Sequence, residues 1–216
     1  MKILSWNIGI GNDNITWENH LVKDLIDIQK PDVILLQEVP DDGAGQNANV
    51  KWLNENFPSY SKNFTARTHD KFAILTKDSA VRVMAGPIPV FIPGNNGYAQ
   101  KTLIENTKTG EKVYIFNTHL KSGDKCRKIR EDQVANMYLR DGDIVAGDLN
   151  EHDLTAIGLG SLAYCGLDPT HFKNTKEVKH DYIGRIDGKS ILNIIPDTSA
   201  ELMNIYDYHK PVCSCI

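Results

Sequence analysis

The chain of 216 residues carries 24 Lys and Arg against 28 Asp and Glu, so its formal net charge is −4, and 41% of it is hydrophobic. This length suits one sizeable core, and we expect a single domain spanning residues 1–216. Because no run of 18 apolar residues occurs and aliphatic residues are plentiful, a transmembrane helix and a disordered chain are both excluded. The acidic balance excludes a protein that binds polyanions over its whole surface, so contact with nucleic acid requires a local basic patch.

Signals for secretion or disulfide formation are weak. Residues 1–7 lack the long apolar region and cleavage site of a secretory signal peptide. The four cysteines, Cys126, Cys165, Cys213 and Cys215, show neither metal-ligand nor redox spacing. We therefore expect an intracellular protein, cytoplasmic or nuclear, that is monomeric and has no membrane partner.

Short apolar runs alternate with loops along the chain, and their periodicity predicts the elements in order. The first half begins with a strand at Lys2–Ile8, a helix at Trp17–Lys30, a strand at Asp32–Leu36 and a helix at Val50–Phe57. Strands follow at Phe72–Thr76, Ala80–Ala85, Tyr98–Glu105 and Lys112–Leu120, then a helix at Lys125–Leu139. The last strands are predicted at Asp143–Ala146, His180–Ile186, Ser190–Ile195 and Pro211–Ile216. Together they predict one α/β domain with mostly antiparallel strands.

Polar side chains that can do chemistry recur where a buried strand stops. They are Asn7, Glu38, Asn117, His119, Asp148, Asn150 and Asp181, together with Asp207 and His209 before the last strand. One carboxylate or histidine in such a position is usually a turn former or a structural residue. So many of them, converging on one edge of the fold, indicate a catalytic site.

The residue types at these strand ends predict a reaction class. Glu38 and Asn7 offer hard oxygen ligands, which suit Mg²⁺, or Mn²⁺ as a substitute, and not zinc. A histidine held by a carboxylate can act as a base or stabilise charge, and the amides of Asn117 and Asn150 can donate to phosphate oxygens. These features together predict metal-assisted hydrolysis of a phosphate ester.

The motifs around these residues resemble those of the endonuclease/exonuclease/phosphatase superfamily, which has the DNase I-like fold. In the family's order they are Ser5-Trp6-Asn7-Ile8, Leu36-Gln37-Glu38-Val39, Phe72-Ala73-Ile74-Leu75, Asn117-Thr118-His119-Leu120, Gly147-Asp148-Leu149-Asn150, His180-Asp181-Tyr182-Ile183 and His209-Lys210-Pro211-Val212. Each motif is weak alone, but seven in order span almost the whole chain. The resemblance implies a four-layer α/β sandwich, in which two mostly antiparallel β-sheets pack face to face with helices outside.

The resemblance also implies roles for individual residues. Asn7 and Glu38 match residues that bind the divalent metal, whereas Asp148 and Asn150 match those that position the attacking water and the phosphate. His119 matches a residue that contacts the phosphate. Asp181 matches the carboxylate that orients the histidine at the position of His209.

One departure from the family pattern concerns the metal site. The family usually ends in Ser-Asp-His, with the Asp at the metal, whereas this chain has Asp207-Tyr208-His209. Neighbouring residues of an extended chain point to opposite sides, so Asp207 does not simply replace the missing carboxylate. Either a local backbone shift lets Asp207 assist the metal, or the site has one ligand fewer and the enzyme is weakened.

The stretch 117–122 and the residues after it most resemble the 5′-tyrosyl-DNA phosphodiesterase branch, which implies nucleic acid, and DNA ends in particular, as substrate and a role in DNA repair. Five basic residues lie within ten positions, Lys121, Lys125, Arg127, Lys128 and Arg130, and could receive a phosphate backbone. A solvated helix start is the alternative reading of this cluster. Lys101, in the preceding strand, is a further candidate phosphate contact.

Two functional hypotheses of different classes follow. The first is a Mg²⁺-dependent phosphodiesterase or nuclease that uses the residues above. The second is a catalytically weakened relative that binds nucleic acid or a protein, motivated by Tyr208. Phosphoesterases that act on poly(A), lipids or inositol phosphates remain alternatives with the same fold.

Overall fold

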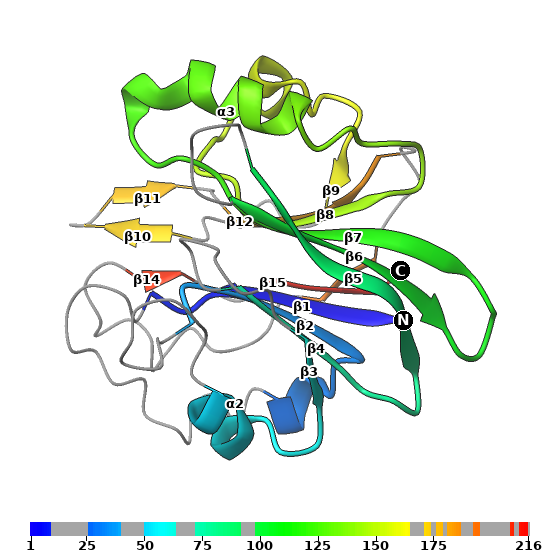
Figure 1. Ribbon diagram of the computed structural model, residues 1–216. Helices are drawn as coiled ribbons and strands as arrows, with labels where there is room; N and C mark the ends of the chain where they lie inside the picture. Colours follow the sequence, from blue (N-terminus) through cyan, green and yellow to red (C-terminus); the bar gives the residue numbers. More distant parts are fainter. Residues whose placement is uncertain are drawn as a thin grey trace.

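Two six-stranded sheets packed face to face form the centre of the molecule (Figure 1). The computed structural model describes residues 1–9, 26–39, 50–63, 72–91, 98–164, 171–173, 176–178, 181–186, 192–194, 208–209 and 212–215. The first sheet has the order β13 (Leu192–Ile194), β15 (Val212–Cys215), β1 (Lys2–Asn7), β2 (Val33–Gln37), β4 (Ala73–Thr76) and β3 (Ser61–Asn63). The second has the order β5 (Val81–Val90), β6 (Ala99–Asn106), β7 (Lys112–His119), β8 (Ile144–Asp148), β12 (Asp181–Arg185) and β9 (Ala163–Tyr164).

A third, small sheet lies at the end of the sandwich toward which β1 runs, at the left of Figure 1. It has the order β11 (Lys176–Val178), β10 (His171–Lys173) and β14 (Tyr208–His209). Its strands are three residues or fewer, too short to give a clear alternating pattern, and the sequence did not predict them.

Each large sheet contains one parallel pair among antiparallel neighbours, which confirms the mostly antiparallel arrangement. In the first sheet β1 pairs with β2 in parallel, with Asn7 opposite Gln37. In the second, β7 pairs with β8 in parallel, with His119 opposite Asp148. Because parallel neighbours end at the same edge of a sheet, each pair delivers two polar strand ends to one place.

Three apolar layers hold the four layers of structure together. The layer between the sheets includes Ile3, Leu35, Ile74, Ile115 and Ile183. The outer face of the first sheet packs through Leu4, Trp6 and Leu36 on α2 (Val50–Asn56), and the outer face of the second packs through Phe116 and Val145 on α3 (Arg127–Ala135). The four-layer sandwich with helices outside is therefore confirmed, and Trp6 is a core residue.

The helix predicted over Lys125–Leu139 is shorter in the structure. The 3₁₀ turn η1 (Asp124–Cys126) precedes α3, which ends at Ala135. The side chain of Asn136 donates to the carbonyl of Asp132, 2.8 Å away, and Tyr138 adopts a φ of 50°. An asparagine that competes for a helical carbonyl in this way favours the end of a helix.

Two other expectations changed at element boundaries. β5 continues to Val90, past the predicted end at Ala85 and through Pro87 and Pro89. Proline is tolerated there because β5 is an edge strand with register shifts, where a missing N–H breaks no sheet ladder. The predicted helix Trp17–Lys30 is seen only as a helical segment at residues 26–29, since residues 17–25 lie outside the described ranges.

Two smaller observations bear on the expectations about membrane and redox chemistry. Over the described ranges, no helix has the length and apolar character needed to cross a membrane. Cys126 and Cys215 are free thiols.

Candidate active site

Four polar side chains from four strands meet at the edge where the two parallel pairs end. Asn7 Nδ2 donates to Glu38 Oε1 at 3.1 Å and to Asp148 Oδ2 at 3.2 Å, and so links the two sheets. His119 lies between the same two carboxylates, with Nδ1 3.7 Å from Glu38 Oε1 and Nε2 3.5 Å from Asp148 Oδ2. The structure thus brings together Asn7, Glu38, His119 and Asp148, which the sequence predicted as site residues.

The backbone turns sharply just after the strands that deliver this cluster. Glu38 and Asn150 have φ angles of 54° and 49°, in the left-handed region that non-glycine residues seldom adopt. Such conformations cost about 1–3 kcal/mol each and are concentrated at functional sites. Their presence directly after β2 and β8 fits a site in which the surrounding structure fixes side-chain direction.

Asp148 and Asn150 are tied to the loop that follows β7. The amide N–H of Asn150 donates to Asp148 Oδ1 at 2.9 Å, and Asn150 Nδ2 donates to the carbonyl of Leu120 at 3.0 Å. The amide N–H of Leu120 donates in turn to the carbonyl of Asp148 at 2.9 Å. Asp181 is buried on β12 directly opposite Asp148 in the antiparallel register, so both carboxylates lie at the same edge.

Asn117 has a different position from the one expected for a substrate-binding residue. Its side chain is 0% exposed, and Nδ2 donates to the carbonyls of Leu36 at 3.0 Å and Ala73 at 3.1 Å. Its Oδ1 accepts from Gln37 Nε2 at 2.6 Å. Because both amide hydrogens bind backbone carbonyls of the other sheet, Asn117 fixes the sheets to each other beneath the cluster, and the expectation of a substrate contact is corrected.

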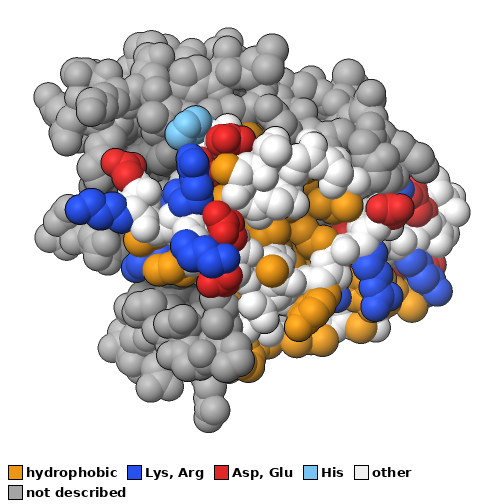
Figure 2. Space-filling model, turned by 90° about the horizontal axis from the view of Figure 1, so that it is seen from above, with side chains coloured by type: hydrophobic (Ala, Val, Ile, Leu, Met, Phe, Trp, Pro, Cys, Tyr) orange, Lys and Arg blue, Asp and Glu red, His pale blue; other side chains and the backbone are white. Residues whose placement is uncertain are grey.

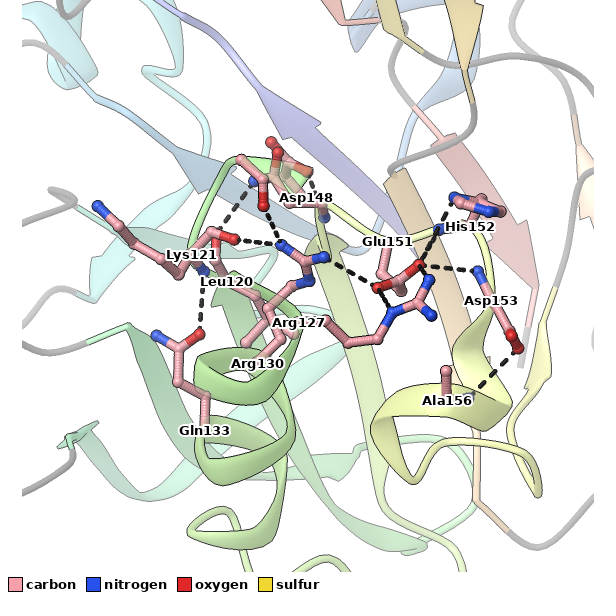
Figure 3. A network of polar contacts seen from close by, with 12 residues as sticks. Leu120, Lys121, Arg127, Arg130, Gln133, Asp148, Glu151, His152, Asp153 and Ala156 are labelled. Carbon is pink, nitrogen blue, oxygen red and sulfur yellow. Dashed lines mark hydrogen bonds and ion pairs between the residues drawn. The ribbon is translucent and has the colours of Figure 1, made fainter. Parts of the chain in front are cut away.

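Arg127 and Arg130 are bound to Glu151, which is not among the site residues predicted from the sequence (Figure 3). Arg127 donates through Nε and Nη2 to the two Glu151 oxygens, each at 3.1 Å, and Arg130 Nη2 donates to Oε2 at 2.9 Å. Arg130 is 3% exposed, so the expectation that it contacts a substrate is corrected. The available signal was a carboxylate directly after the Asp148-Leu149-Asn150 motif, with two arginines three residues apart elsewhere in the chain.

Three of the five basic residues between Lys121 and Arg130 are therefore paired with carboxylates of the same protein. Lys128 pairs with Glu131 at 3.1 Å and Asp132 at 3.2 Å. Figure 2 accordingly shows acidic and basic side chains interleaved on the face seen from above, rather than one basic surface. Lys121 and Lys125 are exposed and form no ion pair with a described residue, so they are the cations still available to a phosphate backbone.

Lys101 also differs from its predicted role. Its Nζ lies over the rings of Tyr114, 4.4 Å from the centroid, and Phe116, at 5.1 Å. These rings lie on the outer face of β7, and Tyr114 is near the beginning of this strand, whereas His119 is its last residue. The structure therefore places Lys101 on these rings and not in the cluster, and its contact with a phosphate stays a prediction.

Two predicted residues are described in part or not at all. The backbone of His209 pairs with that of His171 in the small sheet, and nothing further is described of its side chain. Asp207 lies outside the described residues. Within the described ranges no group of three His, Cys, Asp or Glu side chains is arranged to hold a metal ion. The oxygen donors that the described chain offers at the cluster are Glu38, Asn7 and Asp148.

The buried carboxyl of Glu151 has a shifted pKa. Burial raises it, but the hydrogen bonds from Arg127 and Arg130 outweigh burial and lower the pKa from its ordinary value of 4.5 to about 2. A lowered folded-state pKa contributes stability that is present above pH 4.5 and is lost as the pH falls through 2.

We expect the free energy of unfolding to decrease by roughly 2–3 kcal/mol between pH 5 and pH 2 through Glu151. Urea denaturation of the native chain and of Glu151→Gln at pH 5, 3.5 and 2.5 measures this contribution. The difference in unfolding free energy between the two chains should shrink as the pH falls, because the glutamine does not titrate. A difference that stays constant over this range would contradict the lowered pKa.

Comparison with known proteins finds similarity at the level of structure. No protein-family model matches the chain, and no curated protein matches it in sequence. The solved structure of D. rerio TDP2 in complex with a single-strand DNA product superposes with a TM-score of 0.73 at 18% identity, covering 99% of this chain and 97% of that one.

Two further solved structures agree over nearly the whole chain. ANGEL2, a 2′,3′-cyclic phosphatase, gives a TM-score of 0.72 at 14% identity, covering 99% of this chain and 93% of that one. An endonuclease/exonuclease/phosphatase from Bacteroides vulgatus gives 0.72 at 17% identity, covering 99% and 97%. The chain therefore has the DNase I-like fold of the endonuclease/exonuclease/phosphatase superfamily.

Proposed function

We propose that the protein is a divalent-metal-dependent phosphodiesterase that hydrolyses phosphodiester bonds in nucleic acid. The observation that carries the proposal is the contact of Asn7 with both Glu38 and Asp148, with His119 beside the same two carboxylates. This cluster lies at the end of a DNase I-like sandwich. The similarity to TDP2, solved with a single-strand DNA product, and to ANGEL2, a 2′,3′-cyclic phosphatase, supports hydrolysis of a phosphoester.

The donor set of this cluster fits a hard divalent cation. Glu38, which is partly exposed, and buried Asp148 are two carboxylates close together, and such a pair favours a cation between them. Asn7 would hold Mg²⁺, or Mn²⁺, with Glu38 through its side-chain oxygen, which accepts from the amide N–H of Gly9 at 3.0 Å in this structure. When bound, the ion would polarise a phosphoryl oxygen and offset the negative charge that develops there. Asp207 is proposed as an additional ligand, and Asp207→Ala should then raise the Mg²⁺ concentration needed for half-maximal activity, whereas an unchanged concentration would remove Asp207 from the site.

The chain's own residues are assigned roles in the proposed reaction. Asp148 and Asn150 hold the attacking water and the phosphate in line, since both are fixed to the loop after β7. His119 donates to a non-bridging phosphate oxygen. His209, oriented by Asp181, stabilises the charge on the phosphoryl group.

Nucleic acid, most specifically DNA ends or 5′-tyrosyl adducts, is the proposed substrate. Its support is the Asn117–Ser122 stretch, the exposed Lys121 and Lys125, and the single-strand DNA product held by D. rerio TDP2. A 2′,3′-cyclic phosphate is a second candidate substrate, because ANGEL2 has a similar TM-score.

Cleavage of a substrate panel in Mg²⁺ tests the proposal. The panel holds a 5′-tyrosyl oligonucleotide, plain single- and double-stranded DNA, poly(A), a 2′,3′-cyclic nucleotide end and an inositol phosphate, and His209→Ala is assayed in parallel. We expect cleavage of a nucleic-acid member that the variant loses. No cleavage of any panel member in either Mg²⁺ or Mn²⁺, with retained oligonucleotide binding, would contradict the proposed enzyme activity. It would favour the catalytically weakened nucleic-acid-binding protein that Tyr208 suggests.

A further inference from the structure

The loops that follow β7 and β8 are bound to each other through one buried carboxylate (Figure 3). Glu151 is 2% exposed, and besides the two arginines it accepts from the amides of His152 and Asp153, each at 3.2 Å. Its own carbonyl accepts from the hydroxyl of Tyr182 on β12 at 3.0 Å. Glu151 is thus fixed to its own loop by the backbone and presents both oxygens to α3.

Arg130 carries this attachment to the loop after β7. Its Nη1 donates to the carbonyls of Lys121 and Gly123, both at 2.9 Å, while Nη2 binds Glu151. Gln133, one turn further along α3, accepts from the amide N–H of Lys121 at 2.9 Å. The loop that begins after His119 is therefore held by α3, and α3 is held by the loop that begins after Asp148.

We propose that Glu151, with Arg127 and Arg130, positions the two loops that carry the catalytic side chains, and that neither arginine binds the substrate. This inference rests on the proposed function, since it names the residues that hold Asn150 and Lys121 in position relative to His119 and Asp148. The hydrogen bond from Asn150 Nδ2 to Leu120 spans the same two loops, so a shift between them would move Asn150 away from the phosphate. Misplacement of about 1 Å can cost about 10²-fold in rate.

The charges in this assembly agree with positioning and not with phosphate binding. Arg127 uses its Nε and Nη2 edge on Glu151, one of the two edges with which an arginine can make a two-point contact to phosphate. Arg130 is buried, and its guanidinium binds one carboxylate and two carbonyls. A phosphate backbone contact is instead available to Lys121, whose side chain is exposed.

Charge-conserving variants separate the two roles. Arg127→Lys retains the positive charge but cannot form the two-point contact with Glu151. Glu151→Gln keeps the size of the side chain and removes its charge. Because Arg127 is 46% exposed, its replacement leaves the Arg130–Glu151 pair in place and does not threaten the fold.

We expect Glu151→Gln and Arg127→Lys to lower kcat about 10- to 100-fold with KM within threefold of the native value, using the substrate identified by the panel. Hydrogen exchange of the His152 and Asp153 amides should accelerate at least tenfold in Glu151→Gln. Lys121→Ala, the comparison variant, should instead raise KM and reduce the slope of log affinity against log salt by about 0.7 for a single-stranded oligonucleotide.

Two results would overturn the positioning role. The first is a Glu151→Gln variant with the kcat of the native chain. The second is full activity in Arg127→Lys together with a raised KM in Arg127→Ala and a smaller slope of log affinity against log salt. If no panel member is cleaved, the proposed function fails separately. The salt slope of oligonucleotide binding then decides: an unchanged slope in Arg127→Ala supports the positioning role, and a reduced slope contradicts it.

Discussion

Replacing Asp148 by Asn is expected to lower the turnover number about 10³-fold on the substrate that the panel identifies. The reason lies in the contacts of its carboxylate. Oδ2 accepts from Asn7 and lies beside His119, whereas Oδ1 accepts from the amide N–H of Asn150. An asparagine has one acceptor oxygen and one donor nitrogen, so in either orientation one donor faces another donor. The variant therefore loses both the negative charge and the geometry that aligns water with the phosphate.

Single-turnover cleavage with enzyme in excess measures this effect apart from product release. Asp141→Asn is the matched control, because it removes the same charge from an exposed position and should retain native activity. A stability cost of about 1–3 kcal/mol is expected for Asp148→Asn from the unpaired donor, and thermal melting shows whether both variants are folded at the assay temperature. Turnover within threefold of the native chain in a folded Asp148→Asn would remove Asp148 from the chemistry.

The position of the cluster was predictable because it depends on where apolar runs stop. Asn7, His119 and Asp148 are the polar residues that end strands of otherwise buried side chains. Their convergence follows once β1 and β2, and β7 and β8, are paired in parallel. The spacing of the strands does not itself specify that pairing, and the resemblance to a known fold was needed for it.

The roles of the polar residues beside the cluster were less predictable, because they depend on which face of a strand a residue occupies. Gln100 and Lys101 are neighbours on β6, and their side chains point to opposite faces of the sheet. Gln100 lies opposite Asn117 on the inner face and is fully buried, whereas Lys101 packs on the outer aromatic rings. In a strand with both faces buried, hydrophobicity does not show which face is which.

Partners distant in the sequence were the hardest to foresee. Glu151 lies 24 residues from Arg127 and 21 from Arg130, so no helical periodicity connects them. The local pattern of five basic residues in ten suggested an open phosphate-binding surface. Tertiary structure supplied one acidic partner, Glu151, to both arginines. Lys128 instead pairs within α3, with Glu131 and Asp132 three and four residues further on.

Gly147 links the fold to the site, and Gly147→Ala is expected to destabilise the protein strongly. Gly147 has a φ of 133°, which L-residues seldom adopt, and it lies on β8 directly opposite Thr118 of β7. A Cβ there would overlap the carbonyl oxygen of Thr118 and lie 2.8 Å from its carbonyl carbon. Because these are backbone atoms, no side-chain rotation relieves the overlap, and the two parallel strands would have to separate.

The expected decrease in unfolding free energy for Gly147→Ala is at least about 4 kcal/mol, a large part of the roughly 5–15 kcal/mol that stabilises most domains. Gly110→Ala is the matched control, since Gly110 has a φ of 72° but nothing within 4 Å of its Cβ position, so the backbone strain alone should cost about 1 kcal/mol. Chemical denaturation of both variants and the native chain measures the difference. Equal costs for the two variants would mean that β7 and β8 can separate at Gly147 without loss, and that the pairing that holds His119 beside Asp148 is not rigid.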